Sequence, residues 1–450
     1  MAEETLEEKA TLLDRFAEVS AKVGNQVHLR SLRDAFATMT PIYILAGIAV
    51  LINNVFFPLF LKDAALKSVQ YWGTSIALGT LNFSAVILAG LIGYCLARNK
   101  RFENAIACVI IGISSLVVMM PQVVTVTLDV EGKTTASVGN AFVTNNTGTN
   151  GLFAAIIIGL LATTLFIRLS SVERLKVRLG EGVPPAVAES FNVMIPMMLT
   201  LSVFALVSAL LFGLFATDLL AIIAAGVAAP LKGIMNAGPW AVIVIYTFAN
   251  LLFCLGIHQS TISGVLAEPI LTVLIVDNMA TFASGGPIPA DHYMNMQIVN
   301  SFALIGGSGC TLALLLDTFI FSKNRVSKDV AKLSILPGIF NINEPVIYGY
   351  PIVFNLSLMV PFVLVPDILI AATYGLTCAG IISPCVVQVP WTTPAVLSAL
   401  FATAGDWRAA AWQVIEIALA MAVYLPFMRV SEKAQAKQAE AYAVEDGSEG

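Results

Sequence analysis

Apolar runs of about 20 residues recur along the whole chain, and they decide its fold class. About 20 apolar residues in a helix cross the hydrocarbon core of a bilayer. Of the 450 residues, 58% are hydrophobic and only 12% are charged, whereas an ordinary soluble protein has about 25% charged residues. The sequence therefore predicts an all-α polytopic membrane protein.

The apolar runs predict about 8–10 transmembrane helices plus two re-entrant hairpins. Counting the hairpins as full crossings gives the upper number. The expected crossings are approximately residues 37–61, 73–97, 105–126, 152–169, 192–215, 298–321, 356–382 and 410–428. The first expected hairpin joins residues 240–257 to 262–276 at Gly256-Ile257-His258-Gln259-Ser260.

The second expected hairpin covers residues 333–354 and places Asn341-Ile342-Asn343-Glu344-Pro345 near its tip. A carboxylate at membrane depth costs roughly 2.5–3.5 kcal/mol, so Glu344 must be partnered, neutral or useful there. Pro337, Pro345 and Pro351 disfavour one continuous helix. Broken backbone at this depth is tolerated only where protein buries it or where it lines a watery cavity. The segment therefore reads as the floor of a binding site.

Basic residues mark the boundaries of several apolar runs. Loops rich in Lys and Arg face the cytoplasm in membrane proteins. The basic clusters lie at residues 28–33, 98–101, 168–178, 323–332 and after Arg429. Placing them all inside gives five crossings up to Phe215, an external stretch at 278–295 and cytoplasmic N- and C-termini. The first hairpin is then entered from outside and the second from the cytoplasm, so we expect their tips to meet near mid-membrane.

The chain divides into three parts. Residues 1–217 are expected to form a scaffold half with five spans, preceded by an amphipathic surface helix over Thr5–Val23 that is not a signal peptide. Residues 218–430 hold most of the ionisable groups within apolar segments and both hairpins, which is typical of a transport half with a binding site at the midplane. Residues 431–450 are expected to be a charged cytoplasmic tail.

Three groups in the second half are candidates for substrate binding. The Glu344 carboxylate and the His258 imidazole suit a polyhydroxylated ligand, and the alternatives are a helix-capping carboxylate and a structural histidine. Trp391 and Thr392 lie in Gln-Val-Pro-Trp-Thr-Thr-Pro, where the indole can stack on the apolar face of a sugar. The alternative for Trp391 is an aromatic anchor at the membrane interface.

Several other functions find no motif in the sequence. The six cysteines have neither metal-ligand nor thiol-redox spacing, and no zinc helix or Ser-His-Asp spacing is present. The phosphate-binding loop of nucleotide-hydrolysing proteins is also missing. We therefore expect no metal, no cofactor and no nucleic-acid partner, with membrane lipid as the surroundings.

Four stretches resemble one known family. They are His-Leu-Arg-Ser-Leu-Arg-Asp-Ala-Phe-Ala-Thr-Met-Thr-Pro at 28–41, Leu-Gly-Ile-His at 255–258, Gly-Ile-Phe-Asn-Ile-Asn-Glu-Pro-Val-Ile-Tyr-Gly-Tyr-Pro at 338–351, and Pro-Trp-Thr-Thr-Pro at 390–394. Their order over about residues 24–429 is similar to that of the lactose/cellobiose-type sugar permeases of the bacterial phosphotransferase system, the enzyme IIC subunits. Diacetylchitobiose and cellobiose carriers look most alike.

The resemblance implies a membrane permease component of a phosphoenolpyruvate-dependent sugar phosphotransferase in the bacterial inner membrane. It implies a homodimer whose interface lies in the N-terminal half, and a C-terminal half that carries a disaccharide in an elevator-type movement. A separate enzyme IIB, phosphorylated on cysteine and supplied by an upstream IIA, would phosphorylate the bound sugar.

The resemblance also implies roles for individual residues. Glu344 would contact the hydroxyl to be phosphorylated, and His258 would position it. The other residues expected to bind sugar are Gln259, Asn341, Asn343, Trp391 and Thr392. Relatives commonly have Gly where this chain has Gln259, and some have Trp where it has Phe253, so the preferred disaccharide stays open.

Three other functions are compatible with the residues alone. The first is a proton-coupled sugar symporter with Glu344 and His258 as proton carriers. The second is a non-transporting membrane receptor, which the buried polar cluster disfavours. The third is a transporter of a non-sugar, which the Trp391 platform and the motif match disfavour.

Overall fold

The computed structural model describes residues 26–127, 135–177, 183–228, 230, 238–350, 352–353 and 355–448. The expected surface helix over Thr5–Val23 lies outside these residues. Within them, seven helical segments are long and apolar enough to cross a membrane, or eight if the bent pair around Ala267 counts as one span. Two shorter apolar helices accompany them. The predicted all-α polytopic fold is confirmed.

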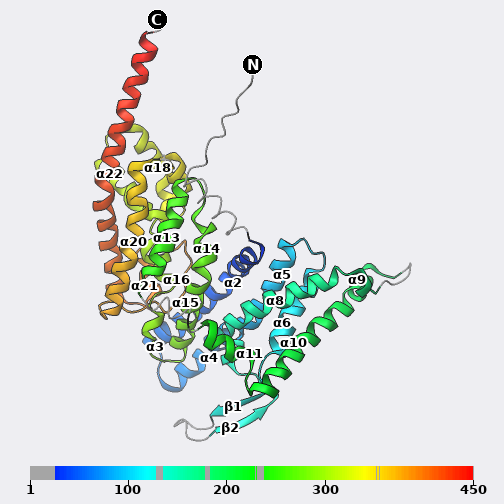
Figure 1. Ribbon diagram of the computed structural model, residues 1–450. Helices are drawn as coiled ribbons and strands as arrows, with labels where there is room; N and C mark the ends of the chain where they lie inside the picture. The colour runs from blue at the N-terminus through cyan, green and yellow to red at the C-terminus, as the bar shows by residue number, and fades with distance from the viewer. Residues whose placement is uncertain are drawn as a thin grey trace, which may run out of the picture.

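In the first half, four helical segments are long and apolar enough to cross a membrane, and a fifth apolar helix, Ala105–Val118, is shorter. Helices α5, α6, α8 and α10 pack together on the right of Figure 1, and α2 and α4 lie between them and the second half. The elements are α2 (Val27–Leu51), a π-helical turn (Ile52–Phe56), α3 (Phe57–Phe60), α4 (Asp63–Gly79), α5 (Ser84–Asn99), α6 (Ala105–Val118), α7 (Thr144–Thr147), α8 (Leu152–Ser170), α9 (Pro185–Asn192), α10 (Met194–Phe215) and α11 (Leu219–Ile223).

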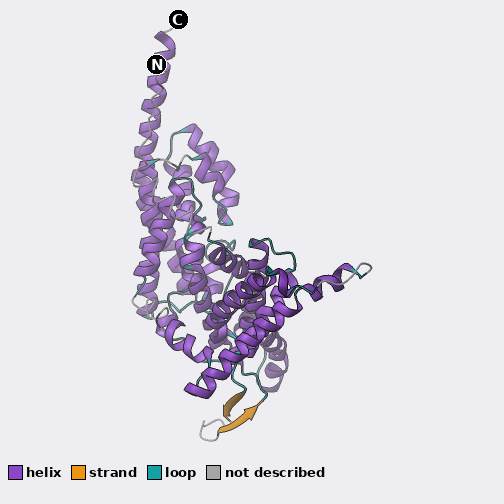
Figure 2. Cartoon of the chain, turned by 45° about the vertical axis from the view of Figure 1, so that its right-hand side comes forward, coloured by secondary structure: helices purple, strands orange, loops and turns teal. Residues whose placement is uncertain are grey.

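Two of the expected spans are wrong in detail. The run 73–97 is not one helix, because the backbone breaks at Thr80 and a 3₁₀ turn separates α4 from α5. The run 105–126 ends as a helix at Val118. Pro121 lacks the N–H that would continue the helix, and the β-branched run after it forms strand β1 (Val123–Thr127), which pairs antiparallel with β2 (Thr135–Gly139). Figure 2 shows this hairpin projecting from the helices.

The second half packs beside the first and contains several places where apolar helices break. Figure 1 shows α22 running along its edge and projecting beyond the bundle at the end opposite the β-hairpin. The elements are α13 (Trp240–Cys254), α14 (Ser263–Leu266), α15 (Glu268–Ala283), α16 (Met296–Ile298), α17 (Thr311–Phe321), α18 (Arg325–Ile339), α19 (Glu344–Gly349), α20 (Leu356–Cys378), α21 (Leu397–Ala402) and α22 (Trp407–Ser448).

The stretch 278–295, expected to lie outside the membrane with Asp291 and His292 solvated, is partly packed into the protein. Helix α15 continues to Ala283, and Asn278 is fully buried, where its Nδ2 donates to the carbonyls of His292 and Cys385 at 3.0 Å each. His292 is 5% exposed. The two hydrogen bonds satisfy Nδ2 of Asn278, whereas its Oδ1 is buried without a partner among the described residues.

Glycines set the close packing of α5 against α6. A Cβ at Gly93 would lie 2.2 Å from the carbonyl oxygen of Cys108, and one at Gly112 would lie 2.3 Å from that of Ala89. Small residues let helix backbones approach in membranes, where packing rather than hydrophobic expulsion drives association. These two contacts hold the first half together.

We predict that Gly93→Ala lowers the apparent melting temperature of the purified protein by several degrees. The added methyl meets backbone that cannot move aside, and overpacking of this kind costs about 1–3 kcal/mol. Gly213→Ala in α10 is the control, because nothing lies within 4 Å of its Cβ position. Equal melting temperatures for the two variants would contradict the close packing.

Candidate functional site

The tip between α18 and α19 is formed by residues 340–343. Helix α18 contains Pro337 and ends at Ile339, and α19 begins at Glu344 with Pro345 in its first turn. Asn341 has φ +63°, a left-handed conformation that Asn adopts more readily than most residues. The predicted hairpin with the Asn-Glu-Pro cluster at its tip is thus present.

The Asn341 side chain joins this tip to two other breaks in the helices. Its Oδ1 accepts from the backbone N–H of Gly306 at 2.7 Å. Its Nδ2 donates to the carbonyl oxygens of Trp391 and Thr393 at 2.6 and 3.1 Å. Backbone groups at a break have no helical partner, and leaving them unpaired at membrane depth costs several kcal/mol each. One amide therefore satisfies three such groups.

The loop that receives Asn341 interrupts the predicted span 298–321. Gly306, Gly307 and Gly309 all have positive φ, which glycine adopts without steric cost. A Cβ at Gly307 would lie 2.5 Å from Cγ of Asn343, so only glycine fits there. Asn343 is 5% exposed and donates to the carbonyl of Ser308 at 2.7 Å.

The segment that carries Trp391 folds back between α20 and α22. We expected only a connection between two spans here and no third hairpin, for which Pro390 and Pro394 were the available signal. The backbone N–H groups of Val386 and Val387 donate to the carbonyl of Ala402 at 2.8 and 3.1 Å. The tip of the second hairpin therefore meets Trp391 and Thr393. Glu344 on this tip also lies close enough for its charge to act on His258.

Asp406 closes the base of this third hairpin. Its Oδ2 accepts from the N–H of Ser383 at 2.8 Å and from the Arg408 guanidinium at 2.9 Å. Burial alone would raise the pKa of Asp406, but the hydrogen bonds from Arg408 and Ser383 outweigh it and lower the pKa from 3.8 to about 2. The carboxylate is therefore ionised at neutral pH and anchors both ends of the hairpin.

Glu344, Trp391 and Thr392 lie at the surface of the joined tips. Glu344 is exposed, and none of the described residues donates a hydrogen bond to its carboxylate. The Trp391 ring is 52% exposed, and Thr392 is half-buried. These three residues thus offer a carboxylate acceptor, an aromatic surface and a hydroxyl. The hydrogen bonds of Asn341 and Asn343 hold the backbone beneath them.

His258 lies in the break between α13 and α14, after Gly256 with φ +87°. Its Nδ1 accepts from the hydroxyl and the N–H of Ser260, at 2.9 and 3.2 Å. This assigns the remaining proton to Nε2, which is therefore available as a donor. The imidazole rests against Phe253, with ring centroids 4.8 Å apart. The buried side chain of Gln259 has an Oε1 atom without a partner among the described residues.

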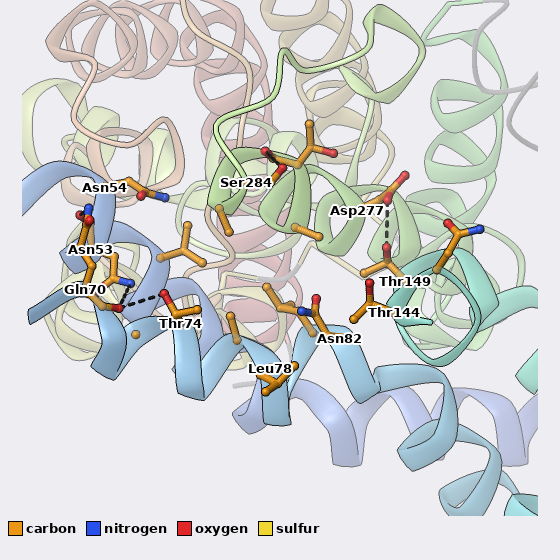
Figure 3. A pocket seen from close by; sticks show the side chains of 18 of the residues that line it. Asn53, Asn54, Gln70, Thr74, Leu78, Asn82, Thr144, Thr149, Asp277 and Ser284 are labelled. Atoms are coloured by element: carbon orange, nitrogen blue, oxygen red, sulfur yellow. Dashed lines mark hydrogen bonds between the residues drawn. The ribbon is translucent and has the colours of Figure 1, made fainter. Parts of the chain in front are cut away.

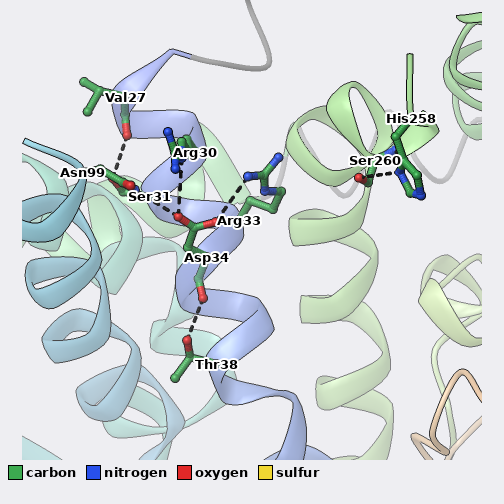
Figure 4. Close-up of polar contacts among 9 residues, drawn as sticks. All are labelled: Val27, Arg30, Ser31, Arg33, Asp34, Thr38, Asn99, His258 and Ser260. Carbon is green, nitrogen blue, oxygen red and sulfur yellow. Dashed lines mark hydrogen bonds and ion pairs between the residues drawn. The ribbon is translucent and has the colours of Figure 1, made fainter. Parts of the chain in front are cut away.

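Two charges from other elements act on the His258 imidazole, those of Glu344 and Arg33. Figure 4 shows Arg33 extending from α2 towards the segment with Ser260 and His258. A Cβ at Gly264 would lie 3.0 Å from Cδ of Arg33. In the sequence, Arg33 stood out only as a topological signal, and nothing local indicated its place beside His258.

The arrangement has the chemistry of a site for a neutral, polyhydroxylated ligand. It offers an acceptor, an imidazole donor and an aromatic surface, with a guanidinium near the imidazole. Among the described residues, no group of three or more His, Cys, Asp or Glu side chains is placed to hold a metal ion.

We predict that Asn341→Gly lowers the melting temperature of the purified protein. Glycine keeps the left-handed backbone, so the loss reports the three amide hydrogen bonds, and each unsatisfied buried group costs about 1–3 kcal/mol. Asn140→Gly is the control, because Asn140 also has a positive φ, +54°, but is exposed beside the β-hairpin. If Asn341→Gly melts like Asn140→Gly, the amide does not hold the tips.

Comparison with known proteins places these features in a family context. Residues 33–366 match the family profile described as "Phosphotransferase system, EIIC". The chain is similar to the oligo-beta-mannoside-specific EIIC component of Bacillus subtilis (strain 168), 29% identical over 431 residues with 95% of each chain covered. It is similar to the cellobiose-specific EIIC component of Lactococcus lactis subsp. lactis (strain IL1403), 27% identical over 483 residues with 92% and 96% covered.

One solved structure has the same fold over nearly the whole chain. It is the crystal structure of the transporter ChbC, the IIC component of an N,N'-diacetylchitobiose-specific phosphotransferase system. The two chains are 27% identical with a TM-score of 0.85, over 94% of this chain and 98% of the other.

Proposed function

This chain belongs to the EIIC family of the phosphotransferase system, and on that premise we propose that it carries a disaccharide inward and presents it for phosphorylation. It is a multi-pass membrane protein and a sugar permease of the cellobiose/lactose family. The relatives named for oligo-β-mannoside, cellobiose and N,N'-diacetylchitobiose support a disaccharide as substrate. Cellobiose, lactose, diacetylchitobiose and gentiobiose form the panel to test.

The observation that carries the proposal is the meeting of three helix breaks under one exposed carboxylate. Glu344 accepts from the sugar hydroxyl to be phosphorylated, and Nε2 of His258 donates to a neighbouring sugar oxygen. The sugar ring stacks on Trp391, with Thr392 and Gln259 as further polar contacts. Asn341 and Asn343 hold the floor of the site, and their direct contact with sugar stays a prediction.

The proposed transfer needs a second protein. The sugar hydroxyl oxygen attacks the phosphorus of a phosphocysteine on enzyme IIB. The oxygen–phosphorus bond forms as the sulfur–phosphorus bond breaks, the thiolate leaves, and the hydroxyl proton passes to Glu344 or to water. Catalysis of phosphoryl transfer is mostly positioning and neutralisation of charge. Glu344 alone would repel the phosphoryl group, so we assign Arg33 as the nearby positive charge.

The side from which enzyme IIB docks follows from the basic residues. The ends of α5, α8 and α17 and the start of α18 carry most of them, together with Arg429 in α22. We infer that this end is cytoplasmic, with both chain termini. Three basic residues lie at the opposite end, contrary to the tendency of Lys and Arg to face the cytoplasm. They are Lys62, Lys67 and Arg408. The β-hairpin then faces outside.

The proposed movement uses the two halves differently. Residues 1–217 act as scaffold and residues 218–430 move as a unit, in an elevator-type transition. Helix α10 presents a large apolar face, with Phe212 78% and Leu214 71% exposed. Lipid or a second copy must cover it in the membrane, and we propose that a homodimer forms through the scaffold half.

We predict that Glu344→Gln abolishes phosphorylation-coupled sugar uptake while sugar binding weakens only modestly. The amide keeps the size of the side chain but accepts the hydroxyl proton poorly. Uptake is measured in membrane vesicles supplied with phosphorylated enzyme IIB. Glu189→Gln in α9 serves as the control, since its carboxylate is exposed and outside the site. Normal coupled uptake by Glu344→Gln would remove this residue from the mechanism.

We predict that Arg33→Gln slows phosphoryl transfer about tenfold or more without weakening sugar binding, because it removes charge that stabilises the transition state. Arg30→Gln is the matched control: Arg30 also pairs with Asp34 on α2 but does not act on His258. Single-turnover transfer from enzyme IIB and sugar-induced shifts in melting temperature separate the two effects. Equal rates for both variants would exclude the role of Arg33.

A further inference from the structure

A cleft of about 580 Å³ lies between the two halves at the end that bears the β-hairpin, well separated in sequence from the joined tips. Figure 3 shows α4 and the turn after α2 on one side and α15 on the other. Its walls include Asn54, Gln70, Thr74 and Asn82 from the scaffold half, and Thr281 and Ser284 from α15. Neither half forms the cleft alone.

The lining of the cleft is polar and almost uncharged. It has six amide side chains, five hydroxyls and one carboxylate, with no Lys or Arg among the lining residues. Apolar side chains such as Val50, Leu78 and Leu81 alternate with them. Amides and hydroxyls both donate and accept, so this lining suits a neutral polyhydroxylated molecule better than an anion. The volume lies within the 300–1,000 Å³ typical of small-ligand sites.

The scaffold wall is held by a reciprocal pair of amides. Nδ2 of Asn53 donates to the carbonyl of Gln70 at 2.8 Å, and Nε2 of Gln70 donates to the carbonyl of Asn53 at 2.9 Å. A Cβ at Gly73 would lie 2.4 Å from the Asn53 amide, so glycine is required. Asn53 lies in a π-helical turn, an irregularity frequent at functional sites. Its Oδ1 is buried without a partner among the described residues.

Hydrogen bonds across the cleft tie its two walls together. Nδ2 of Asn54 donates to the carbonyl of Phe282 at 3.3 Å, and the Thr149 hydroxyl donates to Oδ1 of Asp277 at 2.9 Å. The next residue, Asn278, donates to the carbonyl of Cys385 in the Trp391 hairpin. The cleft therefore lies next to the base of the Trp391 hairpin. Its shape depends on the position of α15.

We propose that this cleft is a second sugar site, an outer vestibule that binds the disaccharide before it reaches Glu344 and Trp391. The inference rests on the proposed function for the sugar class and for the side that faces outside. Sugar in the vestibule contacts both halves, so binding there favours the arrangement in which α15 lies against the scaffold. Movement of the transport half opens the cleft and releases the sugar towards the tips.

The test fills the cleft with Thr74→Trp and compares it with Ser75→Trp. The two residues are neighbours on α4, both are exposed, and both hydroxyls bond to the carbonyl four residues earlier. Only Thr74 lines the cleft. The probe is the first sugar of the four-member panel that the wild-type chain phosphorylates. Uptake is measured in right-side-out vesicles, and phosphorylation of sugar supplied from the cytoplasmic face in inside-out vesicles.

We expect Thr74→Trp to raise KM for uptake from outside about fivefold or more, because lost ground-state binding appears in KM. Its phosphorylation of sugar from the cytoplasmic face should stay within about twofold of the wild type, and Ser75→Trp should match the wild type on both sides. Ser284→Trp, which fills the cleft from α15, should repeat the sided effect.

Two results would reject the vestibule. One is an unchanged KM from outside for both cleft variants, and the other is an equal loss on both sides of the membrane. A wild-type chain that phosphorylates no sugar of the panel would instead reject the proposed function. The two failures are therefore distinguishable.

Discussion

Backbone polar groups at a break in an apolar helix need partners, and the structure of this chain depends on how it supplies them. Three of the segments that break lie together, at Gly306, at Asn341 and at Trp391. The single Asn341 amide pairs with backbone groups of the other two breaks. In lipid, irregular backbone persists only when protein or a water-filled cavity satisfies it. The breaks therefore have to meet, and their meeting brings Glu344 and Trp391 to one surface.

Two kinds of helix contact fit the proposed division into a fixed and a moving half. In the first half, α5 and α6 approach so closely that glycine is required at Gly93 and Gly112. The contacts between the halves that border the cleft are of another kind, since they include individual hydrogen bonds from Asn54 and Thr149 to α15. A few exchangeable hydrogen bonds across a polar cleft are compatible with the proposed sliding of the transport half against the scaffold half. Close helix packing at glycines is compatible with a scaffold half that stays fixed.

Local sequence signals predicted much of this fold. Apolar run lengths predicted the polytopic class, and proline spacing located the hairpin with Glu344. Failures occurred where the deciding partner is distant in sequence. The return of the Trp391 segment depends on Asn341 and on Gln413, which accepts from the N–H of Val396, and extended backbone has no apolar period to reveal it. Residues 123–126 were assigned to a span on hydropathy alone, although Pro121 and the β-branched run favour a strand.

The candidate residues of the site divide in the same way. His258 and Glu344 were singled out from residue type and position, and the fold places the Glu344 charge within electrostatic reach of His258. Arg33 was invisible as a site residue because α2 and α14 are brought together only by tertiary packing. The roles of His258, Gln259, Asn341, Asn343, Glu344, Trp391 and Thr392 in sugar binding remain predictions from pattern and placement.

A structure of the chain with a phosphorylatable disaccharide bound tests the central claim most directly. We predict that the sugar ring lies on the Trp391 indole, that one sugar hydroxyl is within hydrogen-bond reach of the Glu344 carboxylate, and that Asn341 keeps its bonds to the Gly306 and Trp391 backbone. Sugar bound away from the joined tips, or an Asn341 side chain that leaves the backbone to bind the sugar, would contradict the account.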